Sequence, residues 1–230
     1  AEDRIREDRK LAEDRAKLER DLTTDRQQEA ALQTYFDRMT ELLLKEKLRT
    51  TENVEVRDVA RTRTLSIMRG LDTQRNKLIL QFLSEAKLIT DENSIFKRAN
   101  MSEMNLEGAN LRHANLQGAN LRHANLKGAH LENVNLQNAD LAGANFESAD
   151  LDNTNLYSAY LFIANLRNAR LWNVNLVDAN LEGVNLEGAD LEDADLSGAN
   201  LTDARYITNK QLKSVKSLKD ATMPDGTKHK

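Results

Sequence analysis

The chain of 230 residues has no cysteine, a single proline and only 4% aromatic residues. Without cysteine it can form no disulfide, thiol nucleophile or thiolate zinc site. It has no apolar run near the roughly 20 residues that a membrane-spanning helix needs. It also has no glycine-rich phosphate loop and no pair of histidines at metal-binding spacing. We therefore expect no enzyme, no cofactor, no bound metal and no membrane span in this chain.

Charge is plentiful but nearly balanced. Charged residues make up 30% of the chain, with 33 basic and 37 acidic side chains and a net charge of -4. The middle of the chain is the anionic part. A general affinity for nucleic-acid phosphates needs an excess of Lys and Arg, so we expect no nucleic-acid partner.

A five-residue repeat dominates the sequence. The unit is Ala-Asn-Leu-x-x, and its large apolar residue recurs 23 times without insertion from Phe96 to Tyr206. In an α-helix this period would spread the leucines around the whole cylinder, and in a flat strand it would alternate them between the two faces. The chain must therefore turn once per repeat if every leucine is to face one core. Gly, Asn, Asp and Ser between the apolar positions suit such turns.

The tandem Ala-Asn-Leu-x-x unit resembles the pentapeptide repeat family. The resemblance implies a right-handed quadrilateral β-helix in which four successive repeats make one square coil, so that the whole array gives nearly six coils. With helices at both ends, the expected fold class is α+β. Large side chains would fill the axis of the coil, among them Leu111, Leu131, Phe146, Leu151, Leu171 and Leu191.

The ends of the rod need caps, because a solenoid exposes its core and an open edge there. We expect a charged helix over residues 1–24, a small bundle over 25–93 with helices at 25–49, 54–69 and 73–88, the β-helix over 94–207, and a cap over 208–230. In that cap, Thr208 and Gln211 predict a capping box and a helix that runs through Val215 and Leu218. A last repeat-like segment, Ala221-Thr222-Met223, follows.

The N-terminal region carries a second resemblance. Arg-Glu-Asp-Arg followed by the run from Tyr35 to Leu44 is similar to the soluble region of cyanobacterial pentapeptide repeat proteins, which often follows membrane-spanning helices. We expect a cytoplasmic protein. The resemblance adds the alternative that a segment absent from this chain tethers it to a membrane.

One group of apolar residues stands where other repeats carry polar ones: Tyr157, Tyr160, Phe162, Ile163 and Val177. Exposed aromatic clusters are typical of protein-binding surfaces. The alternative is that these side chains lie flat on the rod or contact the N-terminal helix. Residues at intervals of 20, which would stack on another outward face, alternate in charge and indicate structural pairing: Glu107, Lys127, Glu147, Arg167 and Glu187. We expect His113, His123 and His130 to be surface residues.

Two functions remain open. The absence of a catalytic motif and the aromatic cluster favour a non-catalytic scaffold, a rigid rod with a helical arm that binds an unidentified protein partner. The alternative is a DNA-mimicking inhibitor of type II topoisomerase, as some family members are. It would rest on acidic residues near the end of the repeats: Asp178, Glu182, Glu187, Asp190, Glu192, Asp193, Asp195 and Asp203. A supercoiling assay separates the two.

Overall fold

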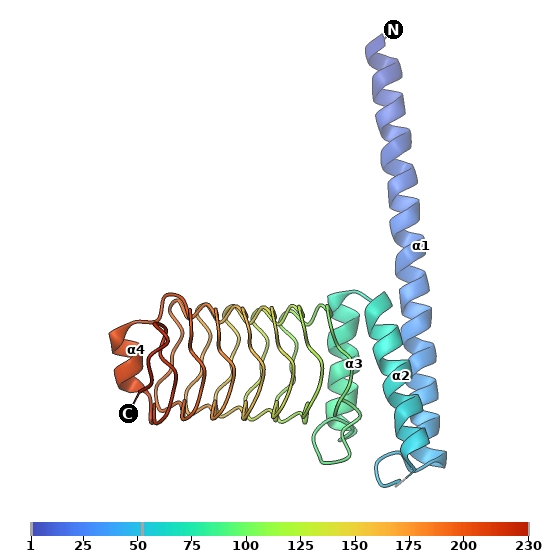
Figure 1. Cartoon of the computed structure of the whole chain (residues 1–230). Helices are drawn as coiled ribbons and strands as arrows, with labels where there is room; N and C mark the ends of the chain where they lie inside the picture. The colour runs from blue at the N-terminus through green and yellow to red at the C-terminus, as the bar shows by residue number, and fades with distance from the viewer. Residues whose placement is uncertain (1, 52, 230) are drawn as a thin grey trace.

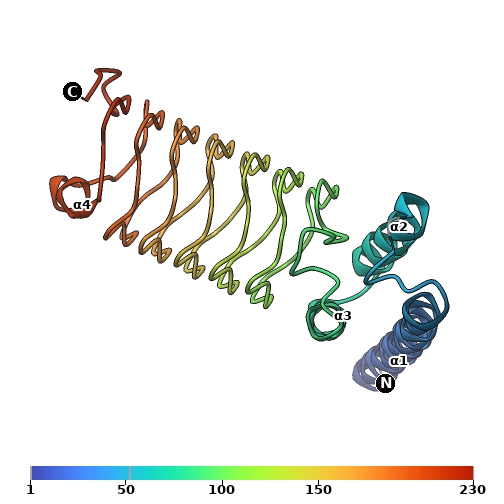
Figure 2. The same ribbon diagram turned by 90° about the horizontal axis from the view of Figure 1, so that it is seen from below.

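The computed structural model describes residues 2–51 and 53–229, which form a helical arm and cap followed by a square coil (Figure 1). The helices are α1 (Glu2–Lys45), α2 (Val54–Gly70) and α3 (Thr73–Glu85), with α4 (Asn209–Ser214) at the far end. Between them the chain winds around one axis, and successive coils lie side by side (Figure 2). The rod therefore has a helical cap at each end.

Each coil takes four repeats, as the resemblance implies. Parallel bridges join Asn110 to His130, His130 to Asp150, and Asp150 to Arg170. Three further series of bridges with the same spacing run along the other faces. The pairing differs from the expected sheets in one respect, because the described residues of the coil form isolated bridges and no extended strand. A turn occupies most of every five-residue face, which leaves one residue per face to pair.

The turns explain the composition of the repeat. The turn after Leu151 is closed by the Thr154 N–H, which donates to the Leu151 carbonyl at 3.0 Å, and Asn153 inside it has a φ of 59°. Residues of this kind tolerate the left-handed region better than most. The Asn or Asp that precedes most of the leucines accepts from the N–H two residues on, as when Lys127 donates to Asn125 Oδ1 at 3.2 Å.

The axis of the coil is filled by the predicted apolar residues. All six of the core positions named from the sequence are buried with at most 1% exposure: Leu111, Leu131, Phe146, Leu151, Leu171 and Leu191. Ala occupies most inner corners, and the hydroxyl of Thr154 at one corner donates to the Leu131 carbonyl at 2.6 Å. Tyr206 was expected to continue the ladder, and this was wrong. It is 64% exposed, because the chain leaves the coil there to enter α4.

The N-terminal helices bury apolar residues that are continuous with the core of the coil, among them Leu32, Tyr35 and Met39 of α1. α1 is one continuous helix, although the sequence suggested separate segments before and after residue 24. Arg75 of α3 binds Asp25 of α1 at 2.6 Å and ties the two helices together at that point. Upstream of it, α1 projects from the body of the molecule (Figure 1).

The helical cap is joined to the first coil through hydrogen bonds to open carbonyls and amides. Arg61 Nε donates to the Ile95 carbonyl at 2.7 Å, and Arg69 donates to the Asn100 carbonyl at 2.8 Å. The N–H of Asn115 donates to the Ile89 carbonyl at 2.6 Å. These bonds satisfy backbone groups that have no preceding coil to pair with.

The far end is closed by α4 and the segment after it. The capping box of Thr208 and Gln211 is present, as predicted. Gln211 Nε2 also donates to the Leu186 and Ala189 carbonyls at 2.9 and 2.8 Å, which covers the edge of the last full coil. The sequence predicted a helix that runs through Val215 and Leu218, but the helix ends at Ser214.

The segment after α4 returns to the coil instead, which is why the helix is short. Ser217 bridges to Asp195, and Thr222 bridges to Asn200. The partners in both bridges lie slightly further apart in the sequence than bridged partners elsewhere, because α4 lengthens this coil. Ala221 is fully buried, so the predicted last repeat is formed.

Leu151→Ala should lower the free energy of unfolding by about 2–5 kcal/mol, because it removes buried methyl groups and leaves a cavity in the axis. Leu151→Arg should prevent folding, since the axis offers no water or counter-charge. Urea unfolding followed by circular dichroism measures both. Leu44→Ala is the control, because Leu44 is 76% exposed and should shift the midpoint little. A soluble Leu151→Arg protein with an unchanged midpoint would contradict the inward placement.

Candidate partner-binding surface

Three of the five predicted surface residues form one cluster on a single face of the coil. The rings of Tyr160 and Phe162 stack with their centroids 6.0 Å apart and an interplanar angle of 21°. Ile163 follows in the same turn, and Tyr160 and Ile163 are 40% and 47% exposed. We call Tyr160, Phe162 and Ile163 the aromatic patch. It is a paired-ring surface in which Tyr160 is exposed and Phe162 is half-buried, the kind that anchors protein partners.

The other two predicted residues lie around the corner of the coil. Tyr157 is 37% exposed, and Val177, which occupies the same position one coil later, is only half-buried. Trp172 is 41% exposed and lies on the face opposite the aromatic patch, two repeats further on. The side chains therefore extend across one corner, and the patch on its own face is the compact part of the surface.

The aromatic patch lacks two structural features that neighbouring repeats share. Tyr160 stands where Asn or Asp accepts the N–H two residues on, as Asn180 does from Glu182 at 2.9 Å. Ile163 stands at the left-handed position, with a φ of 52°, where most other repeats have Asn, Asp, Ser, His or Gly. A β-branched residue is strained in that region. The patch thus gives up local stability and exposes apolar side chains.

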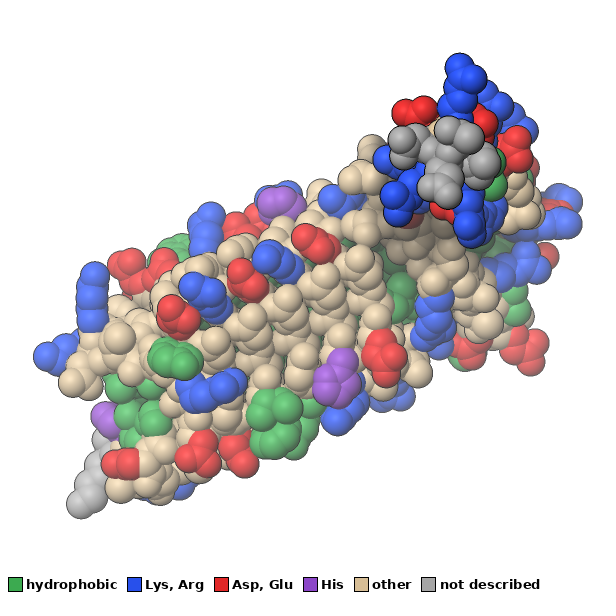
Figure 3. Space-filling view, turned by 90° about the horizontal axis from the view of Figure 1, so that it is seen from above, with side chains coloured by type: hydrophobic (Ala, Val, Ile, Leu, Met, Phe, Trp, Pro, Cys, Tyr) green, Lys and Arg blue, Asp and Glu red, His purple; other side chains and the backbone are tan. Residues whose placement is uncertain are grey.

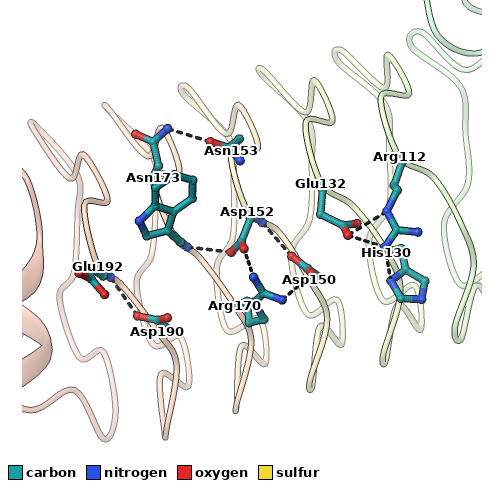
Figure 4. Close-up of polar contacts among 11 residues, drawn as sticks. Arg112, His130, Glu132, Asp150, Asp152, Asn153, Arg170, Asn173, Asp190 and Glu192 are labelled. Atoms are coloured by element: carbon teal, nitrogen blue, oxygen red, sulfur yellow. Dashed lines mark hydrogen bonds and ion pairs between the residues drawn. The ribbon is translucent and has the colours of Figure 1, made fainter.

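Charged side chains alternate along another face of the rod (Figure 4). Arg112 Nε donates to Glu132 at 2.8 Å, and the same guanidinium contacts His130 at 3.0 Å. Arg170 binds both Asp150, at 3.1 Å, and Asp152. Opposite charges one coil apart stabilise the stacking of coils, so this network is structural.

The pKa values in this network follow burial and pairing. Burial raises the pKa of Asp150 above its usual value, and the nearby carboxylate of Asp152 adds to the effect. Burial also raises the pKa of Glu132, but hydrogen bonds from its own backbone and from Arg112 outweigh this and lower it. Glu132 therefore stays charged in the folded protein.

The alternating ladder predicted from the sequence, Glu107 to Glu187, is partly paired. Lys127 binds Glu147 and Arg167 binds Glu187, each at 3.3 Å. His113 and His123 are exposed, whereas His130 is half-buried. Among the described residues, no group of His, Asp and Glu is arranged to hold a metal ion, and none of the helices is long and apolar enough to cross a membrane.

The acidic residues near the end of the repeats do not make a uniform anionic face. Glu187 pairs with Arg167, and Asp195 lies 3.6 Å from Lys216. In the space-filling view, red and blue side chains alternate along the rod and hydrophobic ones occur in separate small groups (Figure 3). The alternative of a DNA-like charge distribution is not favoured by this pattern.

One feature of the helical cap was missed by the sequence reasoning. A groove of about 970 Å³ lies between α1 and α2, lined by Ala31 and Thr34 of α1 and by Ser66 and Ile67 of α2 among others. The sequence carries no signal for it, because small polar residues such as Thr34 and Ser66 are ordinary on the exposed face of a helix.

The comparisons with known proteins agree on the repeat. The family model for pentapeptide repeats (8 copies) matches residues 94–133, 129–161 and 164–203. A pentapeptide repeat protein, Rfr23 from the cyanobacterium Cyanothece, is 34% identical, with 44% of this chain and 85% of that chain covered and a TM-score of 0.38. No curated protein matches the chain.

Two further solved structures are similar. HetL from the cyanobacterium Nostoc, a pentapeptide repeat protein involved in heterocyst differentiation regulation, is 31% identical over 58% of this chain and 76% of its own, with a TM-score of 0.25. A pentapeptide repeat protein from the thylakoid lumen of Arabidopsis thaliana is 28% identical over 41% and 72%, with a TM-score of 0.34.

Ile163→Asn should raise the free energy of unfolding by about 1 kcal/mol, because Asn is less strained than a β-branched residue at a φ of 52°. Urea unfolding measures the change. Asn138→Ile, made at the equivalent turn position on another face, where φ is 58°, should lower the midpoint by a similar amount. If Ile163→Asn is destabilising, the contact of its side chain outweighs the backbone strain.

Glu132→Gln should destabilise the protein at pH 7, and this destabilisation should disappear at acidic pH. The pKa of Glu132 is lowered on folding, so its charge contributes stability above the unfolded pKa of about 4.3, and that contribution is lost as the pH falls through the folded value. Unfolding midpoints from pH 7 to pH 3 test this. Glu192→Gln is the control, since Glu192 is exposed at a later position of the same ladder. A difference from wild type that persists unchanged at pH 3 would contradict the role of the charge.

Proposed function

Because the chain belongs to the pentapeptide repeat family, whose members form right-handed quadrilateral β-helices and are generally non-enzymatic structural or interaction proteins, we propose that it is a non-catalytic scaffold that binds another protein. The rod presents the partner-binding surface, and the helical arm supplies a second region for contacts. The axis of the coil is filled with leucine, so binding takes place on the outer faces.

A single observation carries this proposal, namely the composition of the aromatic patch. At Tyr160 and Ile163 the chain departs from the residues that stabilise its own turns. Backbone strain persists where surrounding structure enforces it, and it concentrates at functional sites. Exposed aromatic residues in turn are the side chains that contribute most to protein interfaces. A strained, exposed apolar cluster on an otherwise polar rod is therefore the best candidate for the partner's docking point.

We infer that this rod acts in the cytoplasm, where a protein partner would meet the aromatic patch. Tethering to a membrane by a segment outside this chain would leave the same surface open, since the patch lies along the rod and α1 projects from the end that carries α2 and α3 (Figure 1).

The test uses a variant that removes the patch without weakening the fold. Tyr160→Asn combined with Ile163→Asn restores the residue types of neighbouring repeats, so the variant should be at least as stable as wild type. Proteins captured from the source cells by wild type should bind it about 30-fold more weakly, as expected when hot-spot residues worth about 2 kcal/mol are lost.

Trp172→Gln is the matched control, because it removes an exposed aromatic residue from the opposite face. It should capture the same proteins as wild type. Equal capture by the patch variant and wild type would refute the surface, and loss with both variants would show that exposed aromatics act without specificity.

A further inference from the structure

The groove between α1 and α2 has the shape of a site for a helix. Its walls carry small side chains from both helices: Ala31 and Thr34 from α1, and Thr62, Ser66 and Gly70 from α2. No residue of α3 lines it among the described residues. Small side chains on both walls let another backbone approach closely, as at closely packed helix pairs. The groove is thus an unfilled position next to a three-helix cap.

The floor of the groove is apolar and ordered. Tyr35 lies at its base and is buried, with its hydroxyl 2.9 Å from the hydroxyl of Thr64. Ile67 and Leu71 of the opposite wall are only half-buried. An occupant with apolar side chains would cover these two residues. Burial of such surface is the main source of favourable free energy for a docked helix.

The length of the groove matches a helix better than a compact ligand. Its lining runs along α1 from Thr24 to Arg38, which spans about 21 Å at 1.5 Å per residue. Gln28 of α1 contacts the carbonyl of Gly70 at 3.4 Å, so α2 runs antiparallel beside this stretch. About four turns of a helix fit along it.

Basic residues lie at both ends of the groove. Arg38 and Arg63 line the end near the α1–α2 connection. Arg38 is paired with Glu41 at 3.1 Å, whereas Arg63 is exposed and has no ion pair among the described residues. At the other end, the same face of α1 continues at intervals of three and four residues into its projecting half. That face carries Arg20, Lys17, Lys10 and Arg6, and the one acidic residue between them on it, Glu13, is paired with Arg9 at 3.2 Å. Around the projecting end of α1, Figure 3 shows Lys and Arg side chains with Asp and Glu among them.

We propose that this groove receives an amphipathic helix of a partner protein, with apolar residues facing Ile67 and Leu71 and with Asp or Glu at both ends. The charge of the rim selects acidic helices over basic ones. The interaction is distinct from that at the aromatic patch, which lies on the rod.

A second copy of this chain fits the groove less well. The exposed leucines of the projecting half, Leu11, Leu18 and Leu22, would be the natural apolar stripe to insert. At 100° per residue, this stripe lies about 170° around α1 from the residues that line the groove. A two-fold pair of α1 helices therefore cannot place both stripes in both grooves.

The experiment uses a fluorescein-labelled peptide of about 21 residues as the probe, with Leu and Ala at intervals of three and four and Glu at the remaining positions. A matched probe has Lys in place of every Glu. Fluorescence anisotropy with the full chain should show saturable binding of the Glu probe, and binding of the Lys probe should be at least about tenfold weaker. Absence of saturable Glu-probe binding below about 1 mM would overturn the proposal.

Two pairs of variants locate the site. Thr34→Trp fills the groove and should weaken Glu-probe binding by about tenfold or more, whereas Thr40→Trp, on another face of α1, should change it less than about twofold. Arg20→Glu combined with Arg63→Glu should weaken the Glu probe and strengthen the Lys probe, whereas Arg26→Glu should do neither.

Further measurements test whether a second copy of the chain or a lipid surface occupies the groove, and whether the aromatic patch contributes to probe binding. Glu-probe affinity that is unaffected by Thr34→Trp would overturn the proposal. So would a wild-type dimer, seen by analytical ultracentrifugation, that Thr34→Trp dissociates, because a second copy would then fill the groove. Phosphatidylglycerol vesicles that bind through the groove while the Glu probe does not would also overturn it. The Tyr160→Asn and Ile163→Asn variant should bind the probe as wild type does, so the two surfaces fail or succeed independently.

Discussion

The structure depends on the register of one coil on the next. Backbone N–H groups of each coil donate to carbonyls of the following one, as when Leu151 donates to Arg170 at 2.8 Å, and bridged partners stay four repeats apart through the repeat region. Register fixes the environment of every side chain: leucine points to the axis, alanine fills the corner, and the two variable residues face outward. Charged ladders such as Arg112 over Glu132 follow from the same register, because outward residues one coil apart are neighbours.

The repeat makes much of the fold predictable, since a five-residue period is incompatible with a helix or a flat strand and requires a turn per repeat. The sequence does not show that pairing shrinks to isolated bridges, because that depends on how much of each face the turn occupies. It also misjudges the ends. Tyr206 has the right spacing for the axis, but the competing start of α4 takes the chain away. Residues 2–45 form one helix because nothing at residue 24 breaks it.

The candidate surfaces differ in how far sequence could reveal them. In a repeat array each residue can be compared with the residues at the equivalent position of the other repeats, so an unusual one is visible from the sequence alone. Tyr160 and Ile163 stand out for that reason. The stacking of Tyr160 on Phe162 and the backbone strain at Ile163 are visible only in the structure. The groove depends on which faces of α1 and α2 meet, and that is a tertiary choice. Neither helix alone has a pattern that specifies it, because Thr34 and Ser66 read as ordinary solvent-facing positions.

The rigid rod holds the aromatic patch and the groove of the helical cap in a fixed arrangement. The aromatic patch lies three coils beyond the first bridge at Asn100, which is about 14 Å along the axis at the usual spacing between strands. The helical cap is bound to that first coil through Arg61 and Arg69, so the groove and the patch are held at a fixed separation. Two partners that bind them would be positioned by the rod without any flexible linker. Adding or removing a whole coil would change that separation in steps of about 4.8 Å and would preserve the face on which the patch lies.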